Sequence, residues 1–522
     1  MKYFPRISQI YAESFLARFD VNLLSHRFMK ITFAIIREIC GRHFLFLTSI
    51  VLLAACQPSE KKESLHEIFL RVNKEVLENS KAYTNLREAT STIGHRLTGS
   101  ANGRRAEDYV YTKFKEYGYD DVHFQEFEVE AWSRGAISVS IDGAIVPAVT
   151  LGHSPLKSDV AGALVDMGNG LEKDYELRPN DVKGKIALIY LGLLEGSEKG
   201  LRNLHRKEKT AIAIRHGATG VILFNQVAKG VLLTGTASAT GSLIPIPAVC
   251  IGKENGMELK QKLRTRDVMA RITMTNQSNK INARNVVATL KGSELPQEQI
   301  IIGGHLDSWD LATGAIDNGI GSFSILDIAR AFKANALVPK RTIQFVMFMG
   351  EEQGLLGSRF RVAQEIRSGS IEAIKYMMNI DMGGNPVGIQ AGGNLTDSSF
   401  FKNLGAEINK IDTAFSNQFN RSLSLHSDHQ PFMMEGIPIL GIVSHLDRTV
   451  YDCYHSDCDN FNLVNEEHLR NTARFGTMIL YGLANADQLP AQPMDSETTK
   501  QFMIDNHLKE PLVIAGDWKW DK

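Results

Sequence analysis

Five short segments of the chain carry side chains of the types that bind metal ions. Each segment ends an apolar run or opens the loop after it: Gly304-His305-Leu306-Asp307, Ile316-Asp317-Asn318-Gly319, Gly350-Glu351-Glu352-Gln353, Asn379-Ile380-Asp381-Met382 and Tyr454-His455-Ser456-Asp457. Buried carboxylates that lie close together are unfavourable unless cations compensate their charge. Imidazole and carboxylate ligands without thiolate suit Zn²⁺, with Mn²⁺ or Co²⁺ as alternatives. One such segment alone is typical of a capped surface pair, but five in order predict a metal site.

The adjacent pair Glu351 and Glu352 is the most informative of these segments. Neighbouring side chains on an extended or turning backbone point in different directions. One carboxylate can therefore bind a metal while the other reaches a water molecule on that metal. Hydrolysis of an amide by activated water requires such a base beside the ion. The alternative interpretation is a helix N-terminus, where acidic residues are favoured.

The elements that must position these side chains lie within residues 285–485, where apolar strands alternate with amphipathic helices. We expect strands at 299–307, 342–350, 376–384 and 437–445, and helices near 318–333, 357–367 and 466–484. Strands that are apolar nearly throughout indicate a sheet buried on both faces by helices. In such α/β sheets, chemistry takes place beyond the carboxyl ends of the strands. The polar segments occur at those ends.

Residues 57–135 precede this region and read as part of the same domain. Helical spacing of apolar residues predicts helices over 63–78 and 101–117, and alternation predicts a strand over 121–130.

Residues 136–284 differ in their pattern of residues, which predicts a small β-rich domain with one or two helices. We find no catalytic cluster in it, and interpret His205, Lys209 and His216 as surface residues. The last residues, 486–522, are polar and predict a loose tail or a packing arm.

The composition excludes several classes of protein. Lys plus Arg number 58 and Asp plus Glu 59, for a net charge of −1, which gives no electrostatic case for nucleic acid as the main partner. Five cysteines in 522 residues exclude a disulfide-rich scaffold. Cys453 and Cys458 flank His455 and could form a local disulfide in an oxidising compartment or remain free thiols. Cys250 is interpreted as a buried small hydrophobe.

The N-terminal residues 1–56 are predicted to direct export of the protein rather than to form part of its fold. Residues 44–55 are apolar or small, too short a run to span a bilayer but suited to a signal-peptide core. The run ends in Leu53-Ala54-Ala55-Cys56, which resembles the lipobox of bacterial lipoproteins, and Met29 is a second candidate start. We therefore expect lipidation of Cys56 and anchoring to the outer membrane, since Gln57 is not the aspartate of inner-membrane retention. The alternative is a soluble secreted or periplasmic protein.

Taken together, the motifs resemble a known family. GGHLDSWDLATGAIDNGIGS, MGEEQGLLGS, NIDMGG, SDHQPF and YHSDCDNF are similar to motifs of the M28 family of di-zinc exopeptidases, within it the carboxypeptidase Q group. The resemblance implies the zinc exopeptidase fold, a mainly parallel or mixed sheet sandwiched by helices. It also implies that residues 136–284 are an inserted, protease-associated domain between two parts of the peptidase domain.

The resemblance assigns a role to each metal-binding candidate. His305 and Asp381 bind one zinc ion, Glu352 and His455 bind the other, and Asp317 bridges the two. Glu351 follows as the general base.

Further residues receive supporting roles. Asp307 orients His305 through its second ring nitrogen, a role that the chemistry of metal sites also favours. The peptide bond between Asp317 and Asn318 is expected to be cis. His429 matches a motif near the substrate pocket, and Trp309 is expected at the pocket rim, so both are candidates for substrate binding.

The function implied is a zinc-dependent exopeptidase that hydrolyses short peptides or dipeptides, of the aminopeptidase or dipeptidase type. A second reading is a glutaminyl-cyclase-like acyltransferase with one zinc ion. A third is a non-catalytic receptor or binding protein on the same fold, in which ligand positions should be lost. Relatives include dimers, so a homodimer is expected.

Overall fold

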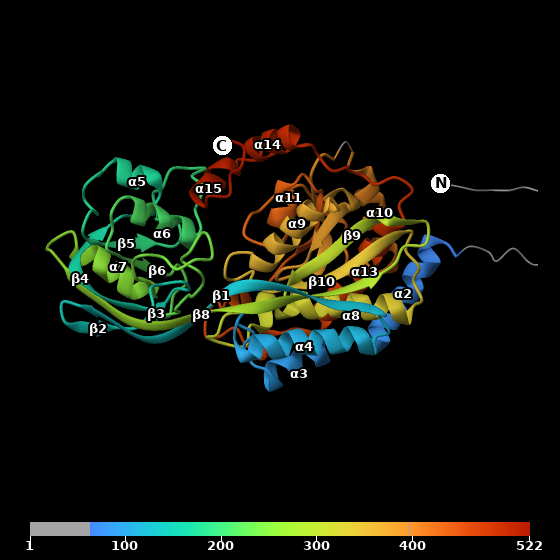
Figure 1. Ribbon diagram of the computed structural model, residues 1–522, viewed down its shortest axis with the longest axis horizontal. Coiled ribbons are helices and arrows are strands. Elements are labelled where there is room, and N and C mark those ends of the chain that lie inside the picture. The colour runs from blue at the N-terminus through green and yellow to red at the C-terminus, as the bar shows by residue number, and fades with distance from the viewer. Residues whose placement is uncertain (1–62, 396, 522) are drawn as a thin grey trace, which may run out of the picture. The chain divides into compact units, whose positions relative to one another are not determined.

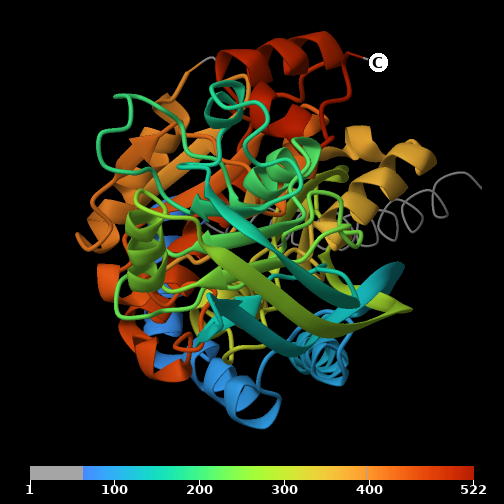
Figure 2. The same ribbon diagram turned by 90° about the vertical axis from the view of Figure 1, so that its left-hand side faces the viewer.

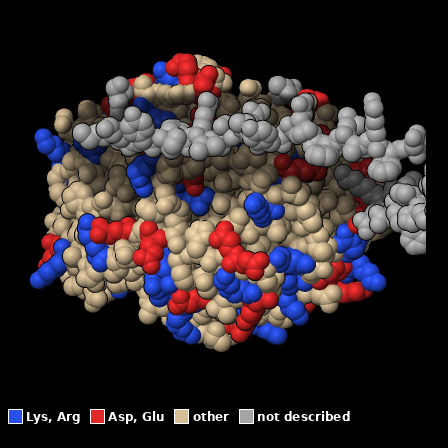
Figure 3. All heavy atoms as spheres, turned by 45° about the vertical axis from the view of Figure 1, so that its right-hand side comes forward, with Lys and Arg blue, Asp and Glu red and all other residues tan. Residues whose placement is uncertain are grey.

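The structure is a computed structural model that describes residues 63–395 and 397–521. The predicted signal peptide and the lipidation of Cys56 lie outside the described residues. Ser64–Lys522 form one compact unit. Within the described ranges, no helix combines the length and the apolar character needed to cross a bilayer. Acidic and basic side chains are interspersed on the face shown in Figure 3, in keeping with the balanced composition.

The metal-binding candidates are positioned by a mixed sheet with strand order β13-β12-β14-β11-β9-β10-β8. Its strands are β8 (Met269–Leu290), β9 (Leu295–His305), β10 (Arg341–Phe348), β11 (Ile374–Asn379), β12 (Pro386–Gly392), β13 (Gln418–Asn420) and β14 (Ile439–Ser444). The central neighbours β14, β11, β9 and β10 are parallel, whereas β12 and β8 pair antiparallel with β14 and β10. The predicted α/β fold with a mainly parallel or mixed sheet is confirmed.

Helices cover both faces of this sheet, which explains why its strands are apolar throughout. Along β9, Ile300 and Ile302 join one core, while Ile301 between them joins a second core on the opposite face. The first core is covered by α2 (Leu65–Asn79), α3 (Ala82–Thr92), α4 (Ala101–Glu116), α8 (Ile320–Ala334), α10 (Ser399–Ile411) and α13 (Glu466–Ala484). The second is covered by α9 (Leu356–Ser368) and α11 (His429–Met434), on the upper side of the sheet in Figure 1.

Two long antiparallel strands, β1 (Asp121–Ile141) and β8, run from the catalytic sheet into the inserted region (Figure 1). The strand predicted over 121–130 is therefore longer than expected, because β8 pairs with it along nearly its whole length. The predicted domain boundaries at 136 and 284 fall inside these two strands. The strand β8 is shared by both regions, since it pairs with β10 at one end and with β4 (Lys157–Asp166) of the insert at the other.

The inserted region extends the sheet beyond β8 and has its own apolar cores, and it faces the viewer in Figure 2. Its elements are β2 (Ala144–Val146), β3 (Ala148–Thr150), β4 (Lys157–Asp166), α5 (Glu172–Glu176), β5 (Ile186–Tyr190), α6 (Arg206–Arg215), β6 (Gly220–Phe224), β7 (Ala248–Ile251) and α7 (Lys253–Lys262). Strands β4, β5, β6 and β7 are parallel neighbours. The prediction of a β-rich insert is confirmed.

One prediction for the insert is wrong. Lys209 is not a surface residue but is fully buried, and its Nζ donates to the carbonyl oxygens of Tyr190, Leu191 and Gly192 at 2.7, 3.2 and 3.1 Å. His205 and His216 are each partly buried. The charged turn at the start of α6 faces the rest of the protein rather than solvent.

The C-terminal residues form a packing arm. They contain α14 (Ser496–Asp505) and α15 (Lys509–Ile514), and Trp518 packs with Met433 and Leu425 of the catalytic region. The short elements that remain are η1 (Ala315–Gly319), η2 (Ile371–Ala373), α12 (Arg448–Tyr451) and η3 (Phe461–Leu463).

Candidate metal centre

The sheet brings the predicted metal-binding side chains together at the carboxyl ends of its parallel strands. His305 is the last residue of β9, Glu351 and Glu352 follow β10, and Asp381 follows β11. Asp317 lies in η1, immediately before α8, and His455 follows α12. This is the edge at which α/β sheets place their ligands.

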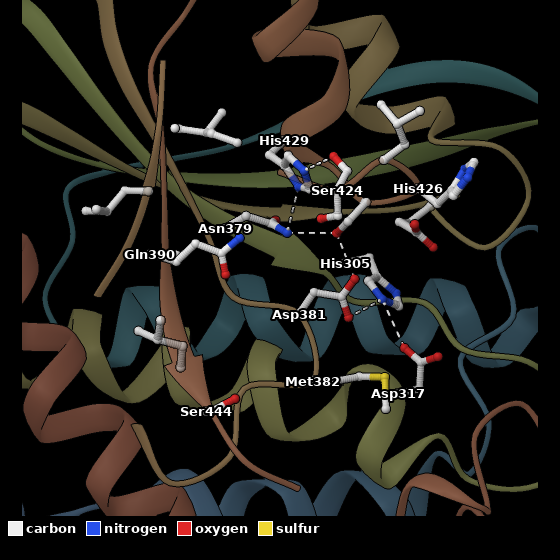
Figure 4. A pocket seen from close by; sticks show the side chains of 18 of the residues that line it. His305, Asp317, Asn379, Asp381, Met382, Gln390, Ser424, His426, His429 and Ser444 are labelled. Carbon is white, nitrogen blue, oxygen red and sulfur yellow. Dashed lines mark hydrogen bonds and ion pairs between the residues drawn. The ribbon is translucent and has the colours of Figure 1, made fainter. Parts of the chain in front are cut away.

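Asp317 contacts two separate groups of ligands, one with each carboxylate oxygen. His305 Nε2 lies 3.2 Å from Asp317 Oδ1 and 3.4 Å from Asp381 Oδ1, as Figure 4 shows. His455 Nε2 lies 2.9 Å from Asp317 Oδ2 and 2.9 Å from Glu352 Oε2. The ligand atoms of each group of three lie within 4.8 Å of one another. The arrangement has two adjacent cation-sized positions that share one carboxylate.

The donor set fits metal ions rather than a purely structural cluster. Glu352 Oε1 and Asp381 Oδ1 are buried and have no hydrogen-bond partner among the described residues. A buried carboxylate oxygen without a donor is unfavourable, and a divalent cation removes this penalty. Two imidazoles and three carboxylates without thiolate have the composition of a zinc site.

The pKa shifts of the buried side chains at this site also favour a bound cation. Burial opposes ionisation of Asp317, but hydrogen bonds to His305 and His455 hold its pKa below the ordinary value. Burial also disfavours the charged form of His305, yet Asp381 and the other carboxylates around it raise its pKa well above 6.5. The surrounding carboxylates thus favour positive charge at this position, which a bound cation would supply.

Comparison with known proteins agrees with this geometry. The sequence profile described as "Peptidase family M28" matches residues 285–479, and that of the PA domain matches residues 160–259. Residues 285–479 are a peptidase domain of family M28. The expectations of this family, of an enzyme of the peptidase class and of a protease-associated insert are confirmed.

Similar proteins include both a carboxypeptidase and an aminopeptidase. Carboxypeptidase Q of Mus musculus is 25% identical over 421 residues, which cover 78% of this chain and 87% of that protein. Aminopeptidase YwaD of Bacillus subtilis is 28% identical over 423 residues, covering 78% and 86%.

Solved structures share the fold. The structure of a Peptidase M28 precursor from Shewanella amazonensis has a TM-score of 0.68 at 22% identity, covering 82% of this chain and 98% of its own. An aminopeptidase from Aneurinibacillus sp. strain AM-1 has a TM-score of 0.61 at 26% identity, covering 81% and 98%. BSAP of Bacillus subtilis, titled a zinc aminopeptidase, has a TM-score of 0.59 at 22% identity, covering 80% and 97%.

Asp307 lies against the second ring nitrogen of His305, the one through which it is predicted to orient this ligand. His305 Nδ1 lies 3.1 Å from the backbone carbonyl oxygen of Asp307 and 3.6 Å from its carboxylate Oδ1. The same Oδ1 accepts a hydrogen bond from the backbone N–H of Glu351 at 3.3 Å. The carbonyl group is therefore the nearer partner of His305, while the carboxylate links the loops that carry His305 and Glu351.

Sequence reasoning missed two residues that hold the bridging loop. Asp459 accepts hydrogen bonds from the backbone N–H groups of Ile316 and Asp317 at 2.7 and 3.1 Å. The buried guanidinium of Arg96 donates to the carbonyl oxygens of Leu306, Thr313 and Gly314 at 2.5, 2.8 and 2.8 Å. Asp459 stands within the motif YHSDCDNF quoted above, whereas Arg96 lies in the segment HRLTGS, to which no role was assigned. The expected cis peptide bond between Asp317 and Asn318 is present.

The inserted domain contributes to the metal centre through Thr234. Its backbone N–H donates to the carbonyl oxygen of His455 at 2.8 Å, and its own carbonyl oxygen lies 3.3 Å from His455 Nδ1. An acceptor at Nδ1 leaves Nε2 free to bind a metal. The loop that carries His455 is also closed by a disulfide between Cys453 and Cys458. Cys250 is buried, as predicted.

A cavity of about 300 Å³ opens beside the ligands. His305, Glu351 and Asp381 line it together with apolar residues from β14 and the loop before α11, among them Leu425 and Ile442. A mostly apolar lining with a few convergent polar groups is typical of a site for a small ligand.

Two polar residues of the segments quoted above, to which the sequence assigned no role, also line this cavity. Asn379 donates to Ser427 Oγ at 2.7 Å, and Ser427 Oγ donates to Asp381 Oδ2 at 2.7 Å. This chain of hydrogen bonds fixes the orientation of the Asp381 carboxylate.

The two candidates for substrate binding differ in position. His429 lines the cavity, with Nε2 3.0 Å from the carbonyl oxygen of Ser424 (Figure 4). Trp309 does not line this cavity. It is buried behind His455 against Trp132 and Leu97, because the insert backbone at Gly152 approaches its ring closely. It lines instead a small pocket of about 10 Å³ beside Asp317 and His455, so its role in substrate binding stays a prediction.

Proposed function

We propose that the protein is a zinc-dependent exopeptidase that hydrolyses short peptides or dipeptides with two zinc ions per chain. One observation carries this proposal: Asp317 directs its two carboxylate oxygens toward two different histidine-carboxylate groups. His305 and Asp381 would hold one ion, Glu352 and His455 the other, and Asp317 both. This arrangement favours two ions over the single-zinc acyltransferase alternative, and the complete ligand set argues against a non-catalytic receptor.

The residues of the chain divide the remaining work. Zinc ions bound here supply Lewis acidity to a water molecule and to the scissile carbonyl group. Glu351 lines the cavity beside His305 and takes a proton from the attacking water on its carboxylate. It then gives that proton to the leaving amine. Burial raises the pKa of Glu351 well above its ordinary value and His305 opposes the shift, so bound cations would favour the ionised form that a base requires.

Zinc binding and peptide hydrolysis are tested together by titrating zinc into the metal-free chain while following hydrolysis of a dipeptide library. We expect binding to saturate at two ions per chain, with dipeptide cleavage appearing as the sites fill. An Asp317→Ala variant should lose both properties. Saturation at one ion with full activity would contradict the proposed centre.

We further propose that the chain is lipidated on Cys56 and anchored to the outer membrane. The support is the sequence pattern at residues 44–56, together with a disulfide that suits an oxidising compartment. A Cys56→Ala form that remains in the membrane fraction would contradict lipid anchoring. The homodimer stays a prediction, to be tested by light scattering of the purified chain.

A further inference from the structure

The two metal positions differ in the part of the chain that orients their histidines. We call the position of His305 and Asp381 the first, and that of Glu352 and His455 the second. The imidazole of His305 is oriented by a backbone carbonyl group of the catalytic region, on the loop after β9. The imidazole of His455 is oriented instead by the backbone carbonyl oxygen of Thr234, which belongs to the insert. The insert therefore reaches the second position directly.

The segment around Thr234 is held by Arg134 in β1, the strand that runs from the catalytic sheet into the insert. Nη2 of Arg134 donates to Thr234 Oγ1 at 2.9 Å, and its Nη1 donates to the carbonyl oxygen of Thr150 at 2.5 Å. The backbone N–H of Gly152 also donates to the carbonyl oxygen of Gly235 at 2.8 Å. One guanidinium thus joins two segments of the insert beside the metal centre.

The same guanidinium holds the catalytic region. Nε and Nη2 of Arg134 donate to the two carboxylate oxygens of Asp310 at 2.7 Å each, and Asp310 lies on the loop that follows His305. The two side chains are only 15% and 16% exposed. Burial opposes ionisation of Asp310, but the hydrogen bonds from Arg134 hold its pKa below the ordinary value, so the pair is charged at neutral pH. Two parallel hydrogen bonds between charged groups fix the relative positions of their chain segments.

Trp309, the residue before Asp310, packs between the two regions. Its ring lies edge-on to the ring of His455, with centroids 6.2 Å apart. A Cβ at Gly152 would fall 2.4 Å from this indole, so the insert backbone lies directly against it. A shift of the insert would therefore move both the carbonyl group that orients His455 and the ring that packs beside it.

We propose that Arg134 is a positioning residue for the second metal position, so that the insert governs the affinity of one of the two ions. This rests on the proposed function. An exposed ion pair between two surfaces contributes little, but Arg134 is mostly buried and its partners lie on three segments that meet beside His455. Loss of a group that orients a metal ligand lowers metal affinity about 10- to 100-fold. Since Arg134 acts through Thr234, we expect the lower end of this range.

The test compares Arg134→Met and Arg134→Lys with a control in the insert. The control is Arg271→Met, in β8, because Arg271 likewise donates to both carboxylate oxygens of an aspartate, Asp159, at 2.7 and 2.6 Å. The Arg271 side chain is 59% exposed. Lysine keeps the charge of Arg134 but lacks the planar fork of donors, so it can replace only part of the contacts. The thermal midpoint of each variant shows whether it is folded.

The measurement is competition for zinc between a chelator and the purified full chain. Arg134→Met should release one ion per chain at about 10-fold lower chelator strength than the wild type, while the other ion is held as before. Arg134→Lys should fall between the two, and Arg271→Met should match the wild type. Equal weakening of both ions, no weakening, or the same loss in Arg271→Met would overturn the proposal. If Arg134→Met is unfolded, Arg134→Lys decides: selective loss of one ion supports the proposal, and unchanged affinity overturns it.

Anomalous diffraction identifies the ion that is lost. At a zinc concentration that fills both positions of the wild type, crystals of the folded Arg134 variant should keep the peak at the first position and show a weaker peak at the second. A weaker peak at the first position instead would overturn the proposal. If the wild type binds one ion only, the proposed function fails whatever the variants show. If it binds two ions and the variant holds both as tightly, only the role of Arg134 fails.

Discussion

Replacing Asp459 by asparagine should weaken zinc binding although the residue touches no ligand side chain. The carboxylate of Asp459 is 4% exposed and accepts hydrogen bonds from two successive backbone N–H groups, at Ile316 and Asp317. Asparagine offers one oxygen and one NH₂ group, so one of these donors would face another donor. Loss of one hydrogen bond to a charged group is worth about 1.5–3 kcal/mol. If that energy positions Asp317, zinc affinity should fall about 10- to 100-fold, the range known for groups that support metal ligands.

The assay is competition for zinc with a chelator, followed on wild type, Asp459→Asn and Asp457→Asn. Asp457 is the control, since it is an exposed aspartate in the same loop. Both ions should be released more easily from Asp459→Asn, because Asp317 serves both positions. Unchanged affinity in Asp459→Asn, or an equal loss in Asp457→Asn, would refute the idea that Asp459 positions the bridging carboxylate.

Two other predictions follow from the burial of acidic groups. Glu351→Gln should keep both zinc ions, measured by metal analysis, yet lower dipeptide turnover at least ~10²-fold; retained turnover would remove Glu351 as the base. Burial raises the pKa of Glu208, in α6, to about 7. Because the folded form holds this proton more tightly than the unfolded form, its contribution to stability is present below pH 4.5 and is lost as pH rises toward 7. Glu208→Gln should therefore gain up to roughly 3 kcal/mol over wild type on going from pH 4.5 to pH 8, measured by urea unfolding; a constant difference across that range would contradict the buried carboxyl.

The metal-binding candidates could be predicted from the sequence because each lies beside an apolar strand or helix in the chain. His305 ends β9 and Asp381 follows β11. Parallel neighbouring strands bring their carboxyl ends to the same edge of the sheet. Asp459 could not be found in this way, since its partners are backbone N–H groups 142 and 143 positions away. Contacts between a side chain and a distant backbone leave no pattern in the local sequence.

The burial of charged residues in the insert and the bounds of the insert could not be predicted, for a related reason. Arg206 and Lys209 stand in a short charged helix, a pattern typical of a solvated face. Lys209 is buried because the carbonyl groups at the end of β5 turn toward it, and Arg206 because α6 meets the catalytic region. The pattern of residues likewise changes at 136 and 284. The strands β1 and β8 nevertheless continue through these positions, because their pairing extends beyond the change.

The central claim is that two metal ions share Asp317. Crystals of the purified chain grown with zinc, with diffraction recorded on both sides of the zinc absorption edge, test it most directly. We expect two anomalous peaks per chain, one between His305 and Asp381 and one between Glu352 and His455, with Asp317 bound to both. A single peak, or two peaks of which one lies away from Asp317, would contradict it.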